Sequence, residues 1–455
     1  MITSAPAFCA GPSSFVNDTT YHAAADHSAF AQKRDSSRSL DWTLVGCLCL
    51  LLAFGPLAFG AVQEWAVCTL EVGAAVCMII WAAGKLVSGR LDLRRSALFL
   101  PIVLFAALVG LQLVSGRTAY WFITWRTALM WSAYGMIFFV TTQALYRTAQ
   151  IRIFAFFFVA FGFLVALFSI VQQFTWNGNL YWVMPNRQAG WVYGPYVDHA
   201  HYAGLMEMLV PIPLVFAMMS CWHKLLRVLF GFAAVLMAST IFFSQSLGGI
   251  VAFGAQLVFL AIIVGVRQHS RRQLLLLIVM TALLALWLLM LSPGGISETM
   301  VRLQDPLGKA GGSDRVRIVK DSLRMIATRP ALGWGLGTFP LVYPSFRTFY
   351  TNFFVNAAHN DYIQIAVETG IAGFALVCCF IVMFYRVSLQ RIANWRTDIR
   401  SAATLAAIVG VTGILIHSLS DFNLQIAANA ALFFALTAVA TGNFHRRVAI
   451  NTFDH

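Results

Sequence analysis

The chain has 455 residues, of which 59% are hydrophobic and 11% charged, and its mean hydropathy is +0.75. Soluble globular domains carry roughly 25% charged residues, so this composition excludes an ordinary soluble protein. The formal net charge is +13. The basic residues lie mainly in short loops between apolar stretches, where orientation in a membrane explains them, so we expect no nucleic-acid partner. None of the eight cysteines has a metal-site spacing, and no disulfide framework is expected.

Residues 1–40 are rich in Ala, Ser and Thr and contain no signal-peptide core, so we predict a disordered cytoplasmic tail. Apolar stretches of membrane-spanning length follow, which predict an all-α integral membrane protein of about twelve transmembrane helices. The predicted spans are 42–62, 65–87, 96–114, 127–146, 151–173, 202–220, 226–244, 247–266, 273–292, 371–386, 402–420 and 426–442. They divide into a first group in 41–292, one long polar loop at 293–361, and a second group in 362–445, before a cytoplasmic tail at 446–455.

The distribution of Lys and Arg predicts the orientation. With the N-terminus in the cytoplasm, most of the 31 Lys and Arg residues fall on the cytoplasmic side. The short outer connections then hold only Arg117, Arg126 and Arg187, as the positive-inside rule requires. The long loop therefore faces outward. Nucleotides are absent there, so a reaction at that face needs a substrate that arrives already activated.

The long loop contains one predicted amphipathic helix, residues 313–329, with Ser313 as a good N-cap. Arg317 and Asp321 lie on its polar side with the i,i+4 spacing of a surface ion pair. Arg315 lies near the centre of the apolar side. Its guanidinium either reaches past the helix end to water or points inward at a phosphate. We favour the second interpretation, because the N–H groups of a first helical turn attract anions.

His359 precedes a helix whose apolar positions run into the next membrane span. A histidine at a membrane surface is the side chain best suited to take a proton near neutral pH. Residue type and position alone leave a plain capping or interfacial histidine equally open.

A second candidate outer site runs from Arg187 to His201. Its many aromatic side chains suit an interfacial belt, although they also suit stacking on sugars. Asp198, His199 and His201 suggest a metal site, but no further ligand follows at zinc spacing, so we predict no metal.

Ionisable residues within or at the edge of predicted spans are Glu71, Glu207, Glu368, His417 and Asp421. Charges at membrane depth are costly, so each indicates either a functional site or a buried pair. His417 and Asp421 lie one helical turn apart, and we predict that they form a structural pair that supports the long loop.

Four stretches together resemble the signature regions of the O-antigen ligase and polymerase family. They are GWGLGTF at 333–339, AHNDYIQ and ETGIAG within 358–373, GPYVDHAHYAGL at 194–205, and HSLSDFNLQ at 417–425. Many members carry an Asn-x-Asn-His run where this chain has Asp198-His199-Ala200-His201, so the role of that segment stays open.

The resemblance implies a GT-C-like membrane glycosyltransferase with twelve helices and a large, partly helical periplasmic loop. Members move a glycan from an undecaprenyl-diphosphate carrier to an acceptor hydroxyl or amine, with inversion and without nucleotide sugar, metal or other cofactor. The implied partners are a lipid-linked glycan donor and a glycan or lipid acceptor in the bacterial inner membrane. The motifs do not separate ligases from polymerases, and they leave the oligomeric state open.

Carried over residue by residue, the resemblance assigns the diphosphate contact to Arg315 and activation of the acceptor to His359. Arg187 is the choice for a second diphosphate arginine. Supporting roles are expected for His201, Tyr343, Asn360, Glu368, His417 and Asp421.

A transporter or flippase for a lipid-linked or anionic solute is the alternative from another class, and a non-catalytic assembly subunit is a third. A transporter would show broken helices in paired halves and charges near mid-span. Here the ionisable residues cluster toward the outer ends of the spans, and one large loop breaks the symmetry. We therefore expect an enzyme.

Overall fold

The computed structural model describes residues 39–89, 91–185, 192–268, 312–351, 354–442 and 447–450. Predictions for residues 1–38, for the span at 273–292 and for Arg187 lie outside these residues.

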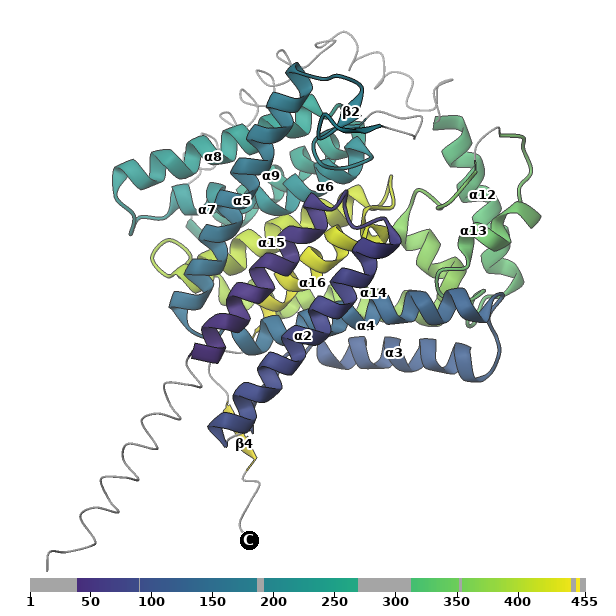
Figure 1. Cartoon of the computed structure of the whole chain (residues 1–455), viewed down its shortest axis with the longest axis horizontal. Helices are drawn as coiled ribbons and strands as arrows, with labels where there is room; N and C mark the ends of the chain where they lie inside the picture. The colour runs from purple at the N-terminus through teal and green to yellow at the C-terminus, as the bar shows by residue number, and fades with distance from the viewer. Residues whose placement is uncertain are drawn as a thin grey trace, which may run out of the picture.

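Helices dominate the described part of the chain (Figure 1). A first helix, Ser39–Leu57, precedes the labelled ones. The other helices are α2 (Glu64–Ser88), α3 (Phe99–Val114), α4 (Trp121–Ala144), α5 (Thr148–Phe174), α6 (His199–Leu209), α7 (Pro211–Met218), α8 (Lys224–Phe243), α9 (Leu247–Gln268), α12 (Gly312–Thr328), α13 (Phe339–Val342), α14 (Asp361–Ser388), α15 (Ile399–His417) and α16 (Ala427–Thr441). Short 3-10 helices are η1 (Tyr343–Ser345), η2 (Leu389–Arg391) and η3 (Asn423–Gln425).

Each predicted span that falls within the described residues coincides largely with helical residues, although the span at 202–220 is divided into two helices, α6 and α7. By length and composition, 8 helices there can cross a membrane, with α6 and α7 counted together as His199–Met218. Helices α3 and α16 are equally apolar in character but shorter. These observations support the predicted all-α membrane fold, and the total of twelve spans stays a prediction.

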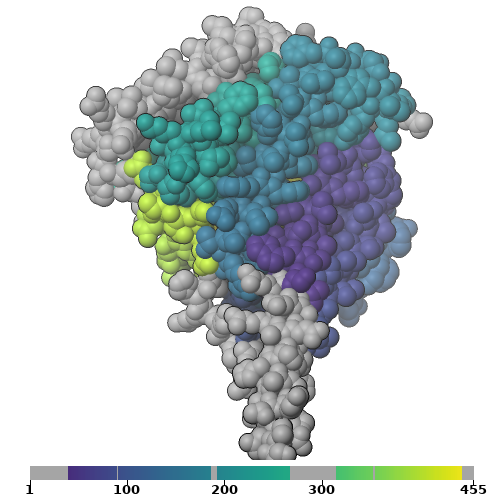
Figure 2. All heavy atoms as spheres, turned by 60° about the vertical axis from the view of Figure 1, so that its left-hand side comes forward, coloured from purple at the N-terminus to yellow at the C-terminus, as the bar shows by residue number. Residues whose placement is uncertain are grey.

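Helices α15 and α16 lie at the centre of the bundle (Figure 1). Their sequences are apolar on all sides and rich in small residues, and almost every side chain in them is buried. Small residues let helices approach closely. In lipid, the hydrophobic effect does not drive helices together, so close packing between them is what holds the bundle. Helices α4, α6, α7, α9 and α14 pack against this pair. In Figure 2 the N-terminal helices (purple), the α5 region (blue) and the α8 region (teal) lie side by side across one face.

Two small antiparallel sheets complete the described chain. Strand β1 (Leu91–Arg94) pairs with β4 (Arg447–Ile450), so the segment predicted as a C-terminal tail contributes a strand. Strands β2 (Asn179–Leu180) and β3 (Met184–Pro185) form a hairpin after α5.

The described residues of the long loop, 312–351 and 354–361, form a small packed unit beside the bundle, built from α12, α13, η1 and the start of α14. Its core comprises Ile318, Met325, Phe339, Val342, Tyr343, Val355, Ala358 and Val367. The amphipathic pattern of 313–329 therefore predicted the helix correctly. The helix begins at Gly312, however, so Ser313 lies in its first turn and is not the N-cap.

The predicted Arg317–Asp321 pair is wrong. Arg317 instead lies 3.8 Å from Asp314, and Arg324 lies 3.2 Å from Asp321. Asp321 is fully buried and faces the loop core, where its carboxylate accepts hydrogen bonds from the Thr348 backbone N–H at 3.1 Å and hydroxyl at 2.9 Å. The buried carboxylate thus has one partner at helix spacing, Arg324, and one from another segment of the loop, Thr348.

The backbone at Gly333 crosses the backbone at Gly370, where α14 bends. Gly370 has a φ of +68°, and a Cβ there would lie 2.4 Å from the carbonyl oxygen of Ala331. Gly333 has a φ of +69°, and its Cβ would lie 2.5 Å from the backbone carbon of Glu368. Both positions need glycine, because the left-handed region and the close backbone contact each exclude a side chain. The crossing separates a short first part of α14, which begins next to His359, from the part inside the bundle.

We expect the substitution Gly370→Ala to destabilise the protein by more than about 1 kcal/mol, because alanine is disfavoured at positive φ and its methyl group would overlap the Ala331 backbone. The melting temperature in detergent measures this effect. Gly231→Ala in α8 is the matched control, since a Cβ there meets nothing within 4 Å. Equal melting temperatures for the two variants would contradict the crossing described above.

Candidate functional site

A tight turn at the end of α15, residues 418–421, holds the candidate site together. The backbone carbonyl of His417 closes it by accepting hydrogen bonds from the N–H groups of Ser420 at 2.9 Å and Asp421 at 3.1 Å. This 418–421 turn presents the Asp421 side chain toward α14.

The start of α14 is docked on the 418–421 turn. The Asn360 side-chain amide donates to the carbonyl oxygen of Leu419 at 2.8 Å, and the Asp361 N–H donates to that of Ser418 at 3.0 Å. The Asp361 carboxylate accepts a hydrogen bond from the Leu424 N–H at 3.0 Å. The predicted supporting residue Asn360 is thus the N-cap of α14 and also a link between two helices.

His359 lies at this junction. Its φ is +49°, which is uncommon for a residue other than glycine, and its side chain is 22% exposed. Nδ1 of His359 lies 3.6 Å from Oδ1 of Asp421. Phe422 packs edge-on against the His359 ring and also against the ring of His201, which is buried. The arrangement leaves the imidazole of His359 partly open to water and backed by a carboxylate.

Arg315 reaches the same turn from α12. Its Nη1 donates a hydrogen bond of 3.0 Å to the carbonyl oxygen of Ser420. The guanidinium therefore lies against the turn that carries Asp421. The two residues that the motifs predict to be catalytic, Arg315 and His359, are both attached to this turn.

The charges around Asp421 keep it ionised. Burial alone would raise the pKa of its carboxyl group. The contact with His359 and the neighbouring side chains of His201, Arg315 and His417 outweigh burial and hold the pKa well below its usual range. A carboxylate that stays negative beside an imidazole orients the ring and stabilises its protonated form.

The predicted His417–Asp421 pair is wrong. His417 lies one layer deeper, and its Nδ1 forms a 2.8 Å hydrogen bond with Oε1 of Glu207 in α6, with both side chains buried. Asp421 pairs with His359 instead. Helical spacing made the first pair plausible, but His417 faces the interior of the bundle.

Glu368 supports the glycine turn of the GWGLGTF motif. Its buried carboxylate accepts hydrogen bonds from the N–H groups of Gly337 at 2.8 Å and Phe339 at 3.4 Å, and from the Gln364 side chain at 3.2 Å. Tyr343, another predicted supporting residue, contacts Asp321 at 3.4 Å and belongs to the loop core. These two residues shape the loop and do not reach His359 through any of these contacts.

The segment from Asp198 to His201 starts α6. The Asp198 carboxylate caps the helix by accepting a hydrogen bond of 2.7 Å from the Ala200 N–H, and His199 Nδ1 lies 3.5 Å from it. Within the described ranges, no group of three or more His, Cys, Asp or Glu residues is placed to hold a metal ion.

An apolar cavity of about 480 Å³ lies between α3, α4, α14 and α16. Its lining includes Phe105, Val109, Trp131, Ile365, Phe380 and Phe434. Asp361 and Gln425 also line it, and both flank the candidate site in sequence. Because Asp361 and Ile381 both contribute, the cavity follows most of the length of α14 from the end near His359.

Sequence reasoning missed two features of the site. Asp361, which anchors the segment after Asp421, could have been suspected from its place directly after His359-Asn360. Glu207 was recognised as an ionisable residue in a span, but no sequence signal identifies His417 as its partner, since the two are 210 positions apart.

A family model described as O-Antigen ligase matches residues 232–378, a range that contains both Arg315 and His359. No curated protein matches the chain.

We expect Glu368→Gln to lower the stability of the loop unit by about 1–3 kcal/mol, because an amide group replaces one acceptor oxygen and leaves buried N–H groups unpaired. Limited proteolysis of the loop and the melting temperature in detergent measure the change. Glu71→Gln in α2 is the control, since Glu71 takes no part in the glycine turn. Wild-type protease resistance of Glu368→Gln would contradict the supporting role.

Proposed function

With the O-antigen ligase and polymerase family supported by the match at residues 232–378, we propose that this chain transfers a glycan from an undecaprenyl-diphosphate carrier to an acceptor hydroxyl at the periplasmic face of the inner membrane. The observation that carries the proposal is that Arg315 and His359 both contact the 418–421 turn. Arg315 contacts the Ser420 carbonyl oxygen, and His359 contacts the Asp421 carboxylate. We favour a polymerase that extends a glycan on its carrier over a ligase, because no feature specific to another acceptor is present.

The leaving group sets the main chemical requirement. When the glycosidic bond to the carrier breaks, its electron pair moves to a diphosphate oxygen, and a fixed cation lowers the barrier by stabilising that charge. Arg315 supplies such a cation without a proton to lose. One of its N–H groups is used by Ser420, and the guanidinium has five in total, so several remain for phosphate oxygens.

The acceptor sets the second requirement. A sugar hydroxyl is a weak nucleophile until a base begins to take its proton. In the proposed step, Nε2 of His359 takes the hydroxyl proton while the hydroxyl oxygen attacks the anomeric carbon and the diphosphate leaves from the opposite side. A single displacement of this kind inverts the anomeric configuration.

Asp421 prepares His359 for that step. Its carboxylate faces Nδ1 of the ring and favours the tautomer in which Nδ1 carries the hydrogen. Nε2 is then unprotonated and able to accept the hydroxyl proton. The same carboxylate stabilises the imidazolium that results.

The apolar cavity suits the lipid part of the donor. It begins beside Asp361, two residues after His359, and continues between helices of the bundle. A polyprenyl chain in this cavity would leave its diphosphate at the end where Arg315 and His359 meet the 418–421 turn.

The opposite end of the bundle supports the proposed orientation. Basic residues gather there in connections that contact one another. Arg400 donates to the carbonyl oxygen of Tyr146 at 3.1 Å, and the carbonyl of Arg396 accepts from the Ser220 N–H at 2.9 Å. Short basic loops face the cytoplasm, so the end with His359 would face the periplasm.

Arg315→Ala and His359→Ala should each reduce glycan transfer by about 100-fold or more, since positioned charge and general base catalysis each contribute at least that factor. Transfer is measured in membrane vesicles with a lipid-linked donor, at equal protein levels. Lys320→Ala, on the exposed side of the same helix, and His223→Ala, just before α8 at the opposite end, are the matched controls. Undiminished transfer by either site variant would refute its assigned role.

The glycan profile of a deletion strain separates the two family activities. Single repeats without long chains indicate a polymerase, whereas long chains retained on the carrier indicate a ligase. Transport of a lipid-linked glycan by the purified protein, without any new glycosidic bond, would instead favour the flippase alternative.

Asp421→Asn should lower transfer by about 100-fold, because asparagine keeps the shape of the side chain but cannot stabilise the imidazolium. A carboxyl group with a lowered folded-state pKa loses its contribution only when the pH falls toward that pKa. Where the imidazole base is unprotonated in both proteins, from about pH 7.5 to 9, the ratio of wild-type to variant rate should therefore stay constant. A ratio that changes with pH in this range would contradict an Asp421 that is always ionised.

A further inference from the structure

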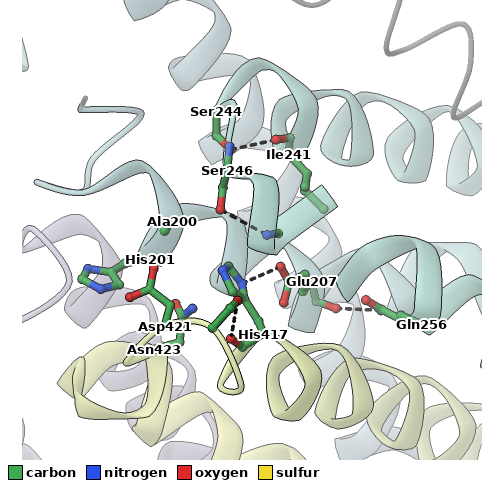
Figure 3. Close-up of polar contacts among 12 residues, drawn as sticks. Ala200, His201, Glu207, Ile241, Ser244, Ser246, Gln256, His417, Asp421 and Asn423 are labelled. Carbon is green, nitrogen blue, oxygen red and sulfur yellow. Dashed lines mark hydrogen bonds and ion pairs between the residues drawn. The ribbon is translucent and has the colours of Figure 1, made fainter. Parts of the chain in front are cut away.

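Behind the 418–421 turn lies a row of buried polar side chains. In Figure 3, His201 and Asp421 lie at one end of this row, His417 lies in the middle, and Glu207 and Gln256 lie at the other end. Apart from Asp421, these side chains take no part in the proposed reaction. The hydrogen bond between Glu207 and His417 is 2.8 Å long, and the two side chains are 0% and 1% exposed. The Gln256 side chain donates to the backbone carbonyl of Glu207 at 2.9 Å, which ties α9 to α6.

The row is rich in polar atoms that have no protein partner. Within the described part of the chain, these include both ring nitrogens of His201, Nε2 of His417, Oε2 of Glu207 and Nδ2 of Asn423. Buried polar groups are nearly always hydrogen-bonded, so these atoms call for an explanation that apolar packing does not give.

The Glu207–His417 pair contributes little to stability by itself. Removing a carboxylate and an imidazole from water costs several kcal/mol, and apolar residues of the same volume are often as stable or more stable. A buried pair of this kind is best explained when it enforces one arrangement of the chain. The arrangement at hand is the position of His417.

His417 controls the 418–421 turn directly. Its backbone carbonyl accepts the two hydrogen bonds that close the turn, so a shift of His417 moves Asp421. Its ring is held by Glu207 on one side and by the start of α9 on the other, where a Cβ on Gly248 would lie 2.9 Å from Nε2. The same Cβ would lie 2.8 Å from Oγ of Ser420, so the start of α9 also packs against the turn.

We propose that Glu207 and His417 are positioning residues: their buried hydrogen bond fixes the 418–421 turn and thereby holds the Asp421 carboxylate against His359. The inference rests on the proposed function, because it assigns these residues to the activity of the same site. Neither residue touches the reacting groups.

Two substitutions of similar volume test the proposal. Glu207→Gln keeps an oxygen that accepts a hydrogen bond from His417, whereas Glu207→Met fills the same space without a strong acceptor. We expect Glu207→Met to lower kcat for transfer about 10-fold with KM for the donor unchanged, because misplacing a catalytic group by a fraction of an ångström has effects of this order. Glu207→Gln should restore kcat to within about 3-fold of the wild-type value.

Combination with Asp421→Asn provides a second readout. If Glu207 acts through the turn that carries Asp421, the double variant Glu207→Met/Asp421→Asn loses less transfer than the product of the two single effects. The turn also holds Arg315, so a part of the Glu207→Met effect remains in the double variant. Fully multiplied effects, or a wild-type kcat for Glu207→Met, would overturn the proposal even though the wild-type enzyme is active.

A third measurement does not depend on activity. Ser418 is fully buried, so a cysteine introduced by Ser418→Cys should react slowly with a maleimide in the detergent-solubilised protein. Mass spectrometry of the labelled peptide should give a labelling rate at least about 5-fold higher in the Glu207→Met background. Without the Glu207–His417 hydrogen bond, the conformation in which residue 418 is exposed to the reagent becomes more populated by that factor. The Glu207→Gln background should leave the rate unchanged. Equal rates in all three backgrounds would overturn the positioning role, whether or not glycan transfer is detected, whereas absence of transfer by the wild-type protein would overturn the proposed function.

Discussion

The candidate site depends on the set of hydrogen bonds that fixes the 418–421 turn. Arg315 and Ser420 are 105 positions apart, and Asn360 and Leu419 are 59 apart, yet both contacts end on carbonyl oxygens of this one turn. Carbonyl oxygens at the end of a helix have no intrahelical partner and attract cations. The end of α15 therefore provides the acceptors on which the loop helix and the start of α14 are assembled.

The glycine motifs give the loop unit its connection to the membrane bundle. Gly333 and Gly370 let two backbone segments cross in contact, and Glu368 binds the N–H groups of the turn that follows. Without these contacts, α12 would be joined to α14 only through side-chain packing. The crossing fixes the part of α14 after His359 against the segment that follows the loop helix with Arg315. Coupled placement of this kind suits a site whose cation and base come from different segments.

Much of the architecture could be predicted from sequence, because the bilayer imposes a length and a composition on each span. The amphipathic helix at 313–329 and the family motifs were also readable. The polar pairs could not be predicted, and the two that were proposed failed for the same reason. Spacing along a helix places Arg317 near Asp321 and His417 near Asp421, but each carboxylate has other partners. Asp321 pairs with Arg324 on its own helix and with Thr348 from another segment. Asp421 pairs with His359, and no local pattern connects either Thr348 or His359 to the carboxylate that it contacts.

The charge balance at the turn bears on how a diphosphate would be held. Arg315 of α12 contacts the turn that carries Asp421, and the two side chains have opposite charges, so together they contribute almost no net charge. A diphosphate brings at least two negative charges, which one neutralised arginine does not offset. A further cation is therefore required on the water side of His359. The family resemblance makes Arg187, which lies outside the described residues, the candidate for that role. The same reasoning explains why Asp421 lies behind the imidazole: a carboxylate in front of it would repel the donor that the site has to bind.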